Sequence, residues 1–186
     1  MSNCLIFDLD DTLYLEREYV FSGFKEIDKF LLKDHKLKGF YKIAKYFFEK
    51  GERDKIFNLS LKELDFSFDE NFILSLIDLY RDHEPNITLT RDSFWALNKY
   101  KNSNLGLITD GHSNSQIRKI KALRLKRYLK KIIVTDELGK KYWKPNPKAY
   151  KLIENYFHKD SEPQNFFYIG DNPIKDFISP KKLGWI

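Results

Sequence analysis

The stretch Leu5-Ile6-Phe7-Asp8-Leu9-Asp10-Asp11-Thr12 decides the fold of this chain. Three apolar residues run directly into a group of acids, which is typical of a short buried strand that ends in a polar loop. In open α/β sheets, ligands bind in the crevice outside the carboxyl ends of the strands. The acids of this stretch are therefore expected at a ligand site.

Further apolar runs repeat this arrangement along the chain. Short strands are predicted at residues 4–7, 105–108, 132–135 and 166–169, and helices between them at 91–100, 113–123, 147–157 and 174–182. Alternating strands and helices predict an α/β fold, a Rossmann-like, doubly wound parallel sheet with helices on both faces. The last residues, Gly184-Trp185-Ile186, are expected to begin one more strand.

One segment departs from this alternation. Residues 20–32, 40–49 and 69–80 have helical patterns, and no strand pattern lies near them. Such a long helical block exceeds a single crossover between neighbouring strands. We therefore predict an α/β core formed by residues 1–14 and 88–186, with an inserted helical unit at 15–87.

The composition limits the function classes. The 186 residues include one cysteine, Cys4, which excludes an internal disulfide framework and a cysteine-based zinc site and suits the cytoplasm. The first apolar run is broken at Asp8, so it is not a secretory signal, and no stretch approaches a membrane span. A soluble cytoplasmic protein is expected, without a membrane partner.

The net charge of +6 fits an anionic partner loosely. The densest basic stretch, residues 118–131, has eight lysines and arginines among its fourteen residues. On a helix it leaves an apolar stripe of Ile117, Ile120 and Leu123. We favour a solvated lysine-rich face over a nucleic-acid groove.

Reactive residues follow each predicted strand, and parallel strands would bring them to one edge of the sheet. They are Asp8 and Asp10, then Thr109-Asp110-Gly111, then Lys144, and then Gly170-Asp171 through Asp176. Asp8, Asp10 and Asp171 would repel one another and raise one another's pKa values. A divalent cation removes this repulsion, and an all-oxygen site with a phosphate substrate favours Mg²⁺.

These residue types are those of phosphoryl transfer. Asp8 is the expected nucleophile, and Asp10 can protonate the leaving group and then deprotonate the attacking water. The Thr109 hydroxyl and nearby backbone N–H groups can bind the phosphoryl oxygens, with Asp110 as a further substrate-binding candidate. Lys144 supplies a positive charge to the same oxygens.

The four motifs, in this order, resemble those of the haloacid dehalogenase (HAD) superfamily, in its phosphatase branch. The resemblance implies strand order 5-4-1-2-3 and a helical cap inserted after the first motif. It also implies that Asp8, Asp171 and the backbone carbonyl of Asp10 bind Mg²⁺. Asp176 would orient a metal-bound water or Lys144.

The sequence departs from the family pattern at three places. Many relatives have Asn where Asp110 stands, and this acid is tolerable only if its backbone N–H, not its side chain, faces phosphate. The loop from Glu137 to Lys144 is longer than usual, which makes Lys141 an alternative to Lys144. Relatives usually complete a fifth strand and add a helix after the position of Ile186.

Several residues have structural interpretations beside the functional ones. Asp11 and Asp110 suit turns or caps, Asp176 suits a pair with a surface lysine, and His112 suits a helix start. The segment containing Tyr14, Glu16 and Arg17 contacts substrate or is a plain linker.

The favoured function is hydrolysis of a small phosphorylated metabolite. A sugar-phosphate mutase of the same superfamily is the first alternative. A phospho-acceptor signalling domain and a nucleic-acid end-processing phosphatase are weaker ones. A dehalogenase is disfavoured because it needs no acid at position 10. The oligomeric state is not predicted.

Overall fold

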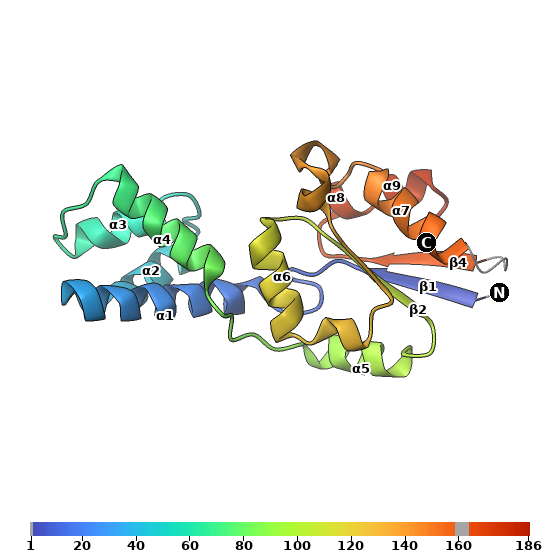
Figure 1. Ribbon diagram of the computed structural model, residues 1–186, viewed down its shortest axis with the longest axis horizontal. Helices are drawn as coiled ribbons and strands as arrows, with labels where there is room; N and C mark the ends of the chain where they lie inside the picture. Colours follow the sequence, from blue (N-terminus) through green and yellow to red (C-terminus); the bar gives the residue numbers. More distant parts are fainter. Residues whose placement is uncertain (1, 159–163) are drawn as a thin grey trace. The chain divides into compact units, whose positions relative to one another are not determined.

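The chain forms two compact units in the computed structural model, which describes residues 2–158 and 164–186. One unit combines Met1–Glu16 with Ile87–Ile186, and the other is Arg17–Asn86. Figure 1 shows the strands within the first unit and a group of helices alone in the second. Among the helices in the described part of the chain, none is both long and apolar enough to cross a membrane.

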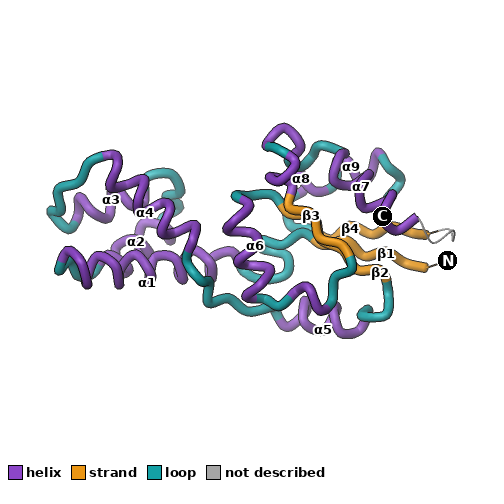
Figure 2. The backbone as a smooth tube through the Cα atoms, viewed as in Figure 1, coloured by secondary structure: helices purple, strands orange, loops and turns teal. Residues whose placement is uncertain are grey.

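The first unit is built on a parallel sheet (Figure 2). Its strands are β1 (Ser2–Phe7), β2 (Asn104–Thr109), β3 (Lys131–Val134) and β4 (Gln164–Ile169), in the order β3-β2-β1-β4. Phe7 at the end of β1 pairs with Leu107 of β2 and Ile169 of β4. The carboxyl ends of these strands are therefore level, and the loops that follow them meet at one edge.

The α/β class is confirmed, but the predicted five-strand order 5-4-1-2-3 needs a correction. The described residues form four strands, in the order that remains when the fifth is removed. The residues expected to begin a fifth strand contribute one backbone pairing: Ile186 N donates to Phe166 O at 2.9 Å and Ile186 O accepts from Tyr168 N at 3.0 Å. A single residue paired at the edge of β4 is too short to count as a strand.

Helices cover the sheet on both sides. They are α5 (Arg91–Lys99), α6 (Ser113–Ala122), α7 (Lys148–Phe157), α8 (Pro173–Asp176) and α9 (Ile178–Lys182). Single 3₁₀ turns lie at Leu125–Arg127, Thr135–Leu138 and Lys140–Tyr142. Figure 1 shows α7 and α9 on one side of the strands and α5 on the other.

The predicted helix at 174–182 is two helices, α8 and α9. Pro180 has no N–H, so it cannot donate to the carbonyl of Asp176 four residues before it. The carbonyl oxygen of Asp176 instead accepts from the Tyr150 hydroxyl at 3.4 Å. The third strand, predicted at 132–135, is shifted by one residue to Lys131–Val134, because Thr135 begins a 3₁₀ turn.

One core cluster of the first unit lies between the sheet and α7. Alternate residues of the strands, such as Cys4 and Ile6 of β1, point to this face, as the period of two requires. The cluster consists of Cys4, Ile6, Ile108, Ile133, Ala149, Tyr150, Ile153, Phe157, Phe166, Tyr168 and Trp185. Trp185 stacks on Phe166 with ring centroids 4.8 Å apart and donates to Glu154 Oε1 at 2.7 Å.

The second unit has its own core. Its helices are α1 (Glu16–His35), α2 (Phe40–Glu49), α3 (Ile56–Glu63) and α4 (Glu70–Asp82). Buried members of the core include Phe24, Ile27, Phe40, Leu61 and Leu76. Helix α3 lies outside the predicted helical stretches. A full core of its own is what an independent helical unit needs.

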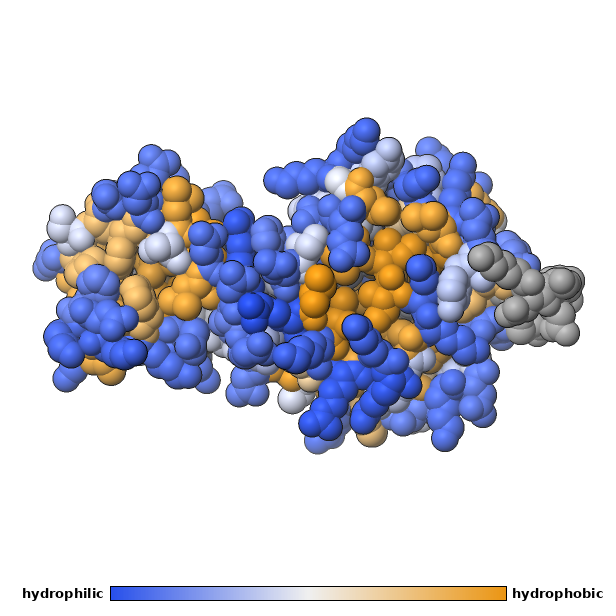
Figure 3. Space-filling model, viewed as in Figure 1, coloured by the Kyte–Doolittle hydropathy of each residue, from blue (hydrophilic) through white to orange (hydrophobic). Residues whose placement is uncertain are grey.

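The outer edge of the sheet at β3 is apolar. Figure 3 shows apolar atoms gathered over this part of the first unit. A shallow groove there is lined by Lys131, Ile132, Ile133, Val134, Glu137, Leu138, Leu152, Asn155 and Tyr156. The strand is four residues long and begins with a lysine, two features that limit pairing of a free sheet edge with other chains.

Candidate active site

The site centres on Asp8, the first residue after β1. Asp8 is 5% exposed, and its Oδ1 lies 2.5 Å from Lys144 Nζ. The same ammonium group lies 2.6 Å from Asp176 Oδ1 and 3.3 Å from the Tyr168 hydroxyl. The structure thus brings together residues from the loops after three different strands, as the parallel sheet predicts. Lys144 bridges two buried carboxylates.

Burial dominates the electrostatics of Asp8. It raises the pKa of Asp8 to about 7, against the opposing effect of Lys144, and the charges of Asp176 and Asp10 add to the rise. Burial also works to lower the pKa of Lys144, but the Asp8 and Asp176 carboxylates outweigh it and raise that pKa. One ammonium group does not fully compensate the negative charge gathered here, so the site favours a further cation.

Three carboxylates could hold that cation. Asp8, Asp171 and Asp176 each offer an oxygen, and these atoms all lie within 4.8 Å of one another. Asp171 is exposed, and its pKa is raised first by desolvation and then by the charges of Asp176 and Asp11. Hard oxygen donors with excess negative charge fit Mg²⁺ or a similar divalent ion. Asp10 does not contribute its carboxylate to this cluster.

Gly170 makes room for Asp176. A Cβ atom at position 170 would lie 2.5 Å from Asp176 Oδ2 and 2.7 Å from its Cγ. Asp176 is fully buried, and its Oδ2 accepts from Asn172 N at 3.0 Å. The carboxylate is therefore packed against the backbone of the loop after β4. This contact fixes its direction toward Lys144.

The carboxylate of Asp10 lies in a separate network. Its Oδ1 accepts from Lys119 Nζ at 2.7 Å and from the Tyr14 hydroxyl, and its Oδ2 accepts from Gln116 Nε2 at 2.8 Å. The Gln116 amide also reaches Thr109 Oγ1 at 2.6 Å. Asp10 and Thr109, which the sequence predicts in the site, are therefore joined through one side chain.

Sequence reasoning missed Gln116 and Lys119. Both lie on α6, which begins four residues after Thr109, and their spacing of three puts them on one face of the helix. Lys119 belongs to the basic stretch 118–131 predicted to be a solvated face, but it is 5% exposed. The available signal was a glutamine and a lysine at helical spacing directly behind the second motif.

Asp110 turns its side chain to the neighbouring loop. Its two oxygens each lie 3.1 Å from Lys144 N, and Oδ1 accepts from the Thr135 hydroxyl at 2.6 Å. Asp110 therefore ties the backbone at Lys144 to the end of β2. Asp11 has a turn role: its backbone has φ +51°, and its carboxylate accepts from Glu16 N at 2.8 Å.

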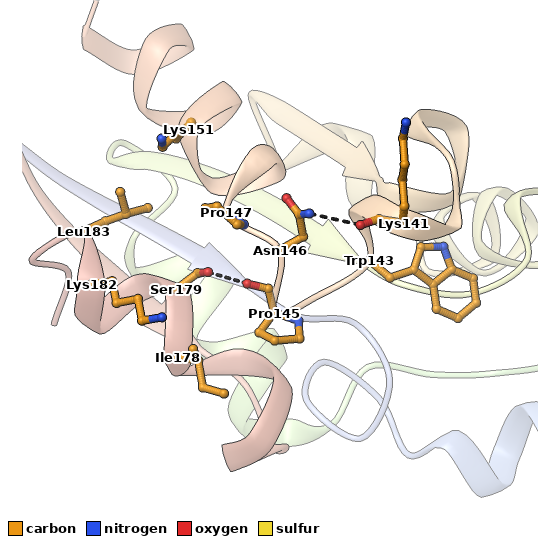
Figure 4. Close-up of a pocket in the computed structure, with 10 residues that line it drawn as sticks. All are labelled: Lys141, Trp143, Pro145, Asn146, Pro147, Lys151, Ile178, Ser179, Lys182 and Leu183. Carbon is orange, nitrogen blue, oxygen red and sulfur yellow. Dashed lines mark hydrogen bonds between the residues drawn. The ribbon is translucent and has the colours of Figure 1, made fainter.

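The alternative lysine, Lys141, lies elsewhere. Its Nζ is 5.1 Å from the ring centroid of Tyr142. It lines a surface hollow with Trp143, Pro145, Asn146, Pro147, Lys151, Ile178, Ser179, Lys182 and Leu183 (Figure 4). Asn146 Nδ2 donates to Lys141 O at 3.0 Å and Ser179 Oγ donates to Pro145 O, so the loop is fixed on two sides. The carboxylate cluster is not part of this lining.

Comparison with known sequences gives relatives of one kind. A glyceraldehyde 3-phosphate phosphatase of Methanocaldococcus jannaschii is 27% identical over 98% of this chain and 82% of its own length. Enzymes of the same name from Pyrococcus abyssi and Pyrococcus furiosus are 34% and 26% identical over 43% and 69% of this chain. These alignments span 32% and 53% of the Pyrococcus enzymes, that is, about a third and a half of their length.

Solved structures show the same fold. A Thermotoga maritima protein provisionally described as a β-phosphoglucomutase aligns with a TM-score of 0.65 and 17% identity, over 98% of this chain and 82% of that one. A 2-haloacid dehalogenase from Pseudomonas syringae aligns with a TM-score of 0.61 and 18% identity, over 100% and 84%. The sequence profile of the haloacid dehalogenase-like hydrolases matches residues 5–185. The chain therefore belongs to the haloacid dehalogenase-like hydrolase family.

Proposed function

We propose that this protein is a Mg²⁺-dependent phosphomonoester hydrolase that works through an aspartyl-phosphate on Asp8. The observation that carries the proposal is the placement of the Asp8 carboxylate, buried between Lys144 and two further acids at the edge of a parallel sheet. A phosphate group entering here would meet a carboxylate nucleophile, an ammonium group and a carboxylate cluster suited to a cation.

The reaction has two balanced steps. In the first, a carboxylate oxygen of Asp8 attacks phosphorus, the ester P–O bond breaks, and Asp10 gives its proton to the departing alkoxide. In the second, water attacks phosphorus, Asp10 takes a proton from that water, and the bond between phosphorus and Asp8 breaks. Inorganic phosphate leaves, and both carboxyl groups return to their first state.

Other residues bind and orient the phosphoryl group. Thr109 is buried at the end of β2, and its hydroxyl accepts from the Gln116 amide that also donates to Asp10. Lys144 neutralises charge on the phosphoryl oxygens, and Asp176 holds the lysine in place from behind. Asp110 acts here through its backbone N–H, because its carboxylate is engaged by Lys144 N and Thr135.

Asp8, Asp171 and Asp176 are the side chains that would hold Mg²⁺ or orient its waters, and the Asp10 backbone carbonyl is a further candidate. When bound, the ion supplies positive charge that lets an anionic nucleophile approach an anionic substrate.

The proposed substrate is a small phosphorylated metabolite. The relatives are named for glyceraldehyde 3-phosphate, which makes this compound the first to test. The proposal includes a cap role for the helical insert, predicted at residues 15–87, in selecting substrates. It also includes a cytoplasmic location.

Release of inorganic phosphate from glyceraldehyde 3-phosphate and from other small phosphomonoesters, with and without Mg²⁺, tests the proposal. We expect turnover that EDTA abolishes and Mg²⁺ restores. Asp8→Asn should lose activity by at least about 10⁴-fold, since it removes the nucleophile. Asp92→Asn, which changes an exposed acid on α5, is the matched control and should keep wild-type activity.

Full activity in Asp8→Asn would refute the nucleophile assignment. Formation of a sugar bisphosphate with no net release of phosphate would instead identify a mutase.

A further inference from the structure

Gln116 and Lys119 surround the carboxylate that the proposed mechanism uses for proton transfer. Three donors converge on Asp10: Lys119 Nζ and the Tyr14 hydroxyl on Oδ1, and Gln116 Nε2 on Oδ2. Both oxygens of the Asp10 carboxylate therefore have hydrogen-bond partners, and these partners fix the direction in which the group points.

The donors are fixed by burial and by the helix. The side chain of Lys119 is 6% exposed and that of Asp10 is 24% exposed, so the ion pair is shielded on the lysine side and open on the acid side. Gln116 is 1% exposed. Its NH₂ group faces Asp10 Oδ2 and, at 2.7 Å, the carbonyl oxygen of Asp110, which can only accept. The orientation of the amide is therefore determined by its partners.

Gly111 provides the space for this amide. A Cβ atom at position 111 would lie 3.2 Å from Gln116 Cδ and 3.4 Å from its Oε1, and the backbone there has φ +120°. The turn that presents Thr109 thus also accommodates Gln116. One NH₂ group contacts both the proposed phosphoryl-binding hydroxyl and the proposed acid–base carboxylate, at 2.6 Å and 2.8 Å.

We infer that Gln116 and Lys119 are positioning residues that hold the Asp10 carboxylate for the second half of the reaction. This inference rests on the proposed function. Asp10, held by these donors, takes a proton from the water as that water attacks phosphorus and the bond to Asp8 breaks. The two donors do not touch the substrate; they act through Asp10, and Gln116 also aligns it with Thr109.

Pre-steady-state kinetics with p-nitrophenyl phosphate test the inference. Formation of the phosphoenzyme releases p-nitrophenolate, which needs little help from an acid, whereas hydrolysis of the phosphoenzyme needs the base. In Lys119→Met and Gln116→Met we expect the first-turnover burst to keep its rate within about threefold. The steady-state rate should fall by roughly 10- to 100-fold, a part of the ~10²–10⁴ typical of general acid–base catalysis. Phosphorylated protein should accumulate, as seen by intact-mass spectrometry.

Two controls separate positioning from a general structural defect. Lys121→Met removes an exposed lysine from the same helix and should leave both phases unchanged. Adding Lys119→Met to Asp10→Asn should slow the steady state no further, because the group being positioned is already disabled. If Lys119→Met does not fold, Gln116→Met alone provides the same comparison.

Equal slowing of both kinetic phases, or additive losses in the double variant, would overturn the inference. Absence of any release of p-nitrophenolate and inorganic phosphate by the wild-type protein with Mg²⁺ would instead refute the proposed function. The orientation can then be tested by crystal structures of wild type and Gln116→Met. An Asp10 carboxylate in the same rotamer in both would overturn the positioning role.

Discussion

Gly170→Ala should be among the most destabilising single changes in the α/β unit. The new methyl carbon would lie 2.5, 2.7 and 3.0 Å from Oδ2, Cγ and Cβ of Asp176. Because the collision reaches the base of the side chain, rotation of the carboxylate alone cannot relieve it. Asp176 is fully buried and has to move away from Lys144 Nζ and Asn172 N, at 2.6 and 3.0 Å.

The magnitude follows from these contacts. Hydrogen bonds to charged groups contribute about 1.5–3 kcal/mol each, and overpacking adds about 1–3 kcal/mol. Partial relaxation of the loop would recover some of this. We expect the free energy of unfolding to fall by about 3–5 kcal/mol, a large share of the roughly 5–15 kcal/mol of a typical domain.

Urea unfolding in EDTA, followed by tryptophan fluorescence, measures this change. The protein has three tryptophans, Trp95, Trp143 and Trp185, and all lie in the α/β unit, so the signal reports that unit alone. The matched control is Gly170→Ala in an Asp176→Ala background, where the carboxylate is absent. The methyl group should cost at least about 2 kcal/mol less there. An equal cost in both backgrounds would refute the steric argument.

Two further predictions concern acids that the structure places in supporting roles. Asp110→Ala removes the acceptor for Lys144 N and Thr135 Oγ1. It should lower the free energy of unfolding by about 2–4 kcal/mol in the same urea assay, and Asp110→Asn should lower it less. Wild-type stability in Asp110→Ala would contradict this prediction. Asp136 is the second case: desolvation works to raise its pKa, but hydrogen bonds from Ser113 N and Oγ outweigh it and lower the pKa. Since its folded pKa lies below the unfolded value near 3.8, its contribution is complete above that value and disappears as pH falls through the folded pKa. Asp136→Asn should therefore be less stable than wild type at pH 6, and the difference should shrink below about pH 4; a difference independent of pH would contradict the assignment.

The sequence was sufficient to place Asp8 and Lys144 at one edge of the sheet. They are 136 positions apart, and only the parallel topology brings them together. That topology could be predicted because each buried strand is a short apolar run followed by reactive polar residues. The same reasoning located Thr109 and Asp171. This reasoning requires only that the carboxyl ends of the strands lie level with one another. It does not depend on any particular side-chain contact.

The partners of Asp10 could not be predicted in this way. Helical periodicity predicts which face of α6 is apolar, and Ile120 and Leu123 of the predicted stripe are buried, whereas Ile117 is 45% exposed. Periodicity gives no reason to bury a lysine, because a buried charge requires a partner. Asp10, which pairs with Lys119, is 109 positions away, on a loop of another strand. Only the folded chain shows that the pair exists.

The break between α8 and α9 could have been predicted from a proline within the periodic pattern. Residues 174–182 have helical spacing, but Pro180, the seventh of these nine residues, removes one backbone donor. Because of the break, the Asp176 carbonyl oxygen accepts a hydrogen bond from the Tyr150 hydroxyl. A proline inside an amphipathic pattern therefore predicts an interruption of the helix, which the pattern alone does not.

The order of the strands explains how the proposed site could hold both a cation and a phosphate. Asp8 directly follows β1, an inner strand of the sheet. On the β4 side lie Asp171 and Asp176, which supply negative charge. On the β2 side lie Thr109 and the donors of α6, and the loop after β3 brings Lys144 across to Asp8. Lys144 meets these acids at Asp8, since its ammonium group also lies 2.6 Å from Asp176 Oδ1. One ammonium group among three carboxylates leaves an excess of negative charge, which would attract a cation, and Lys144 with the Thr109 hydroxyl would be the groups available to a phosphate.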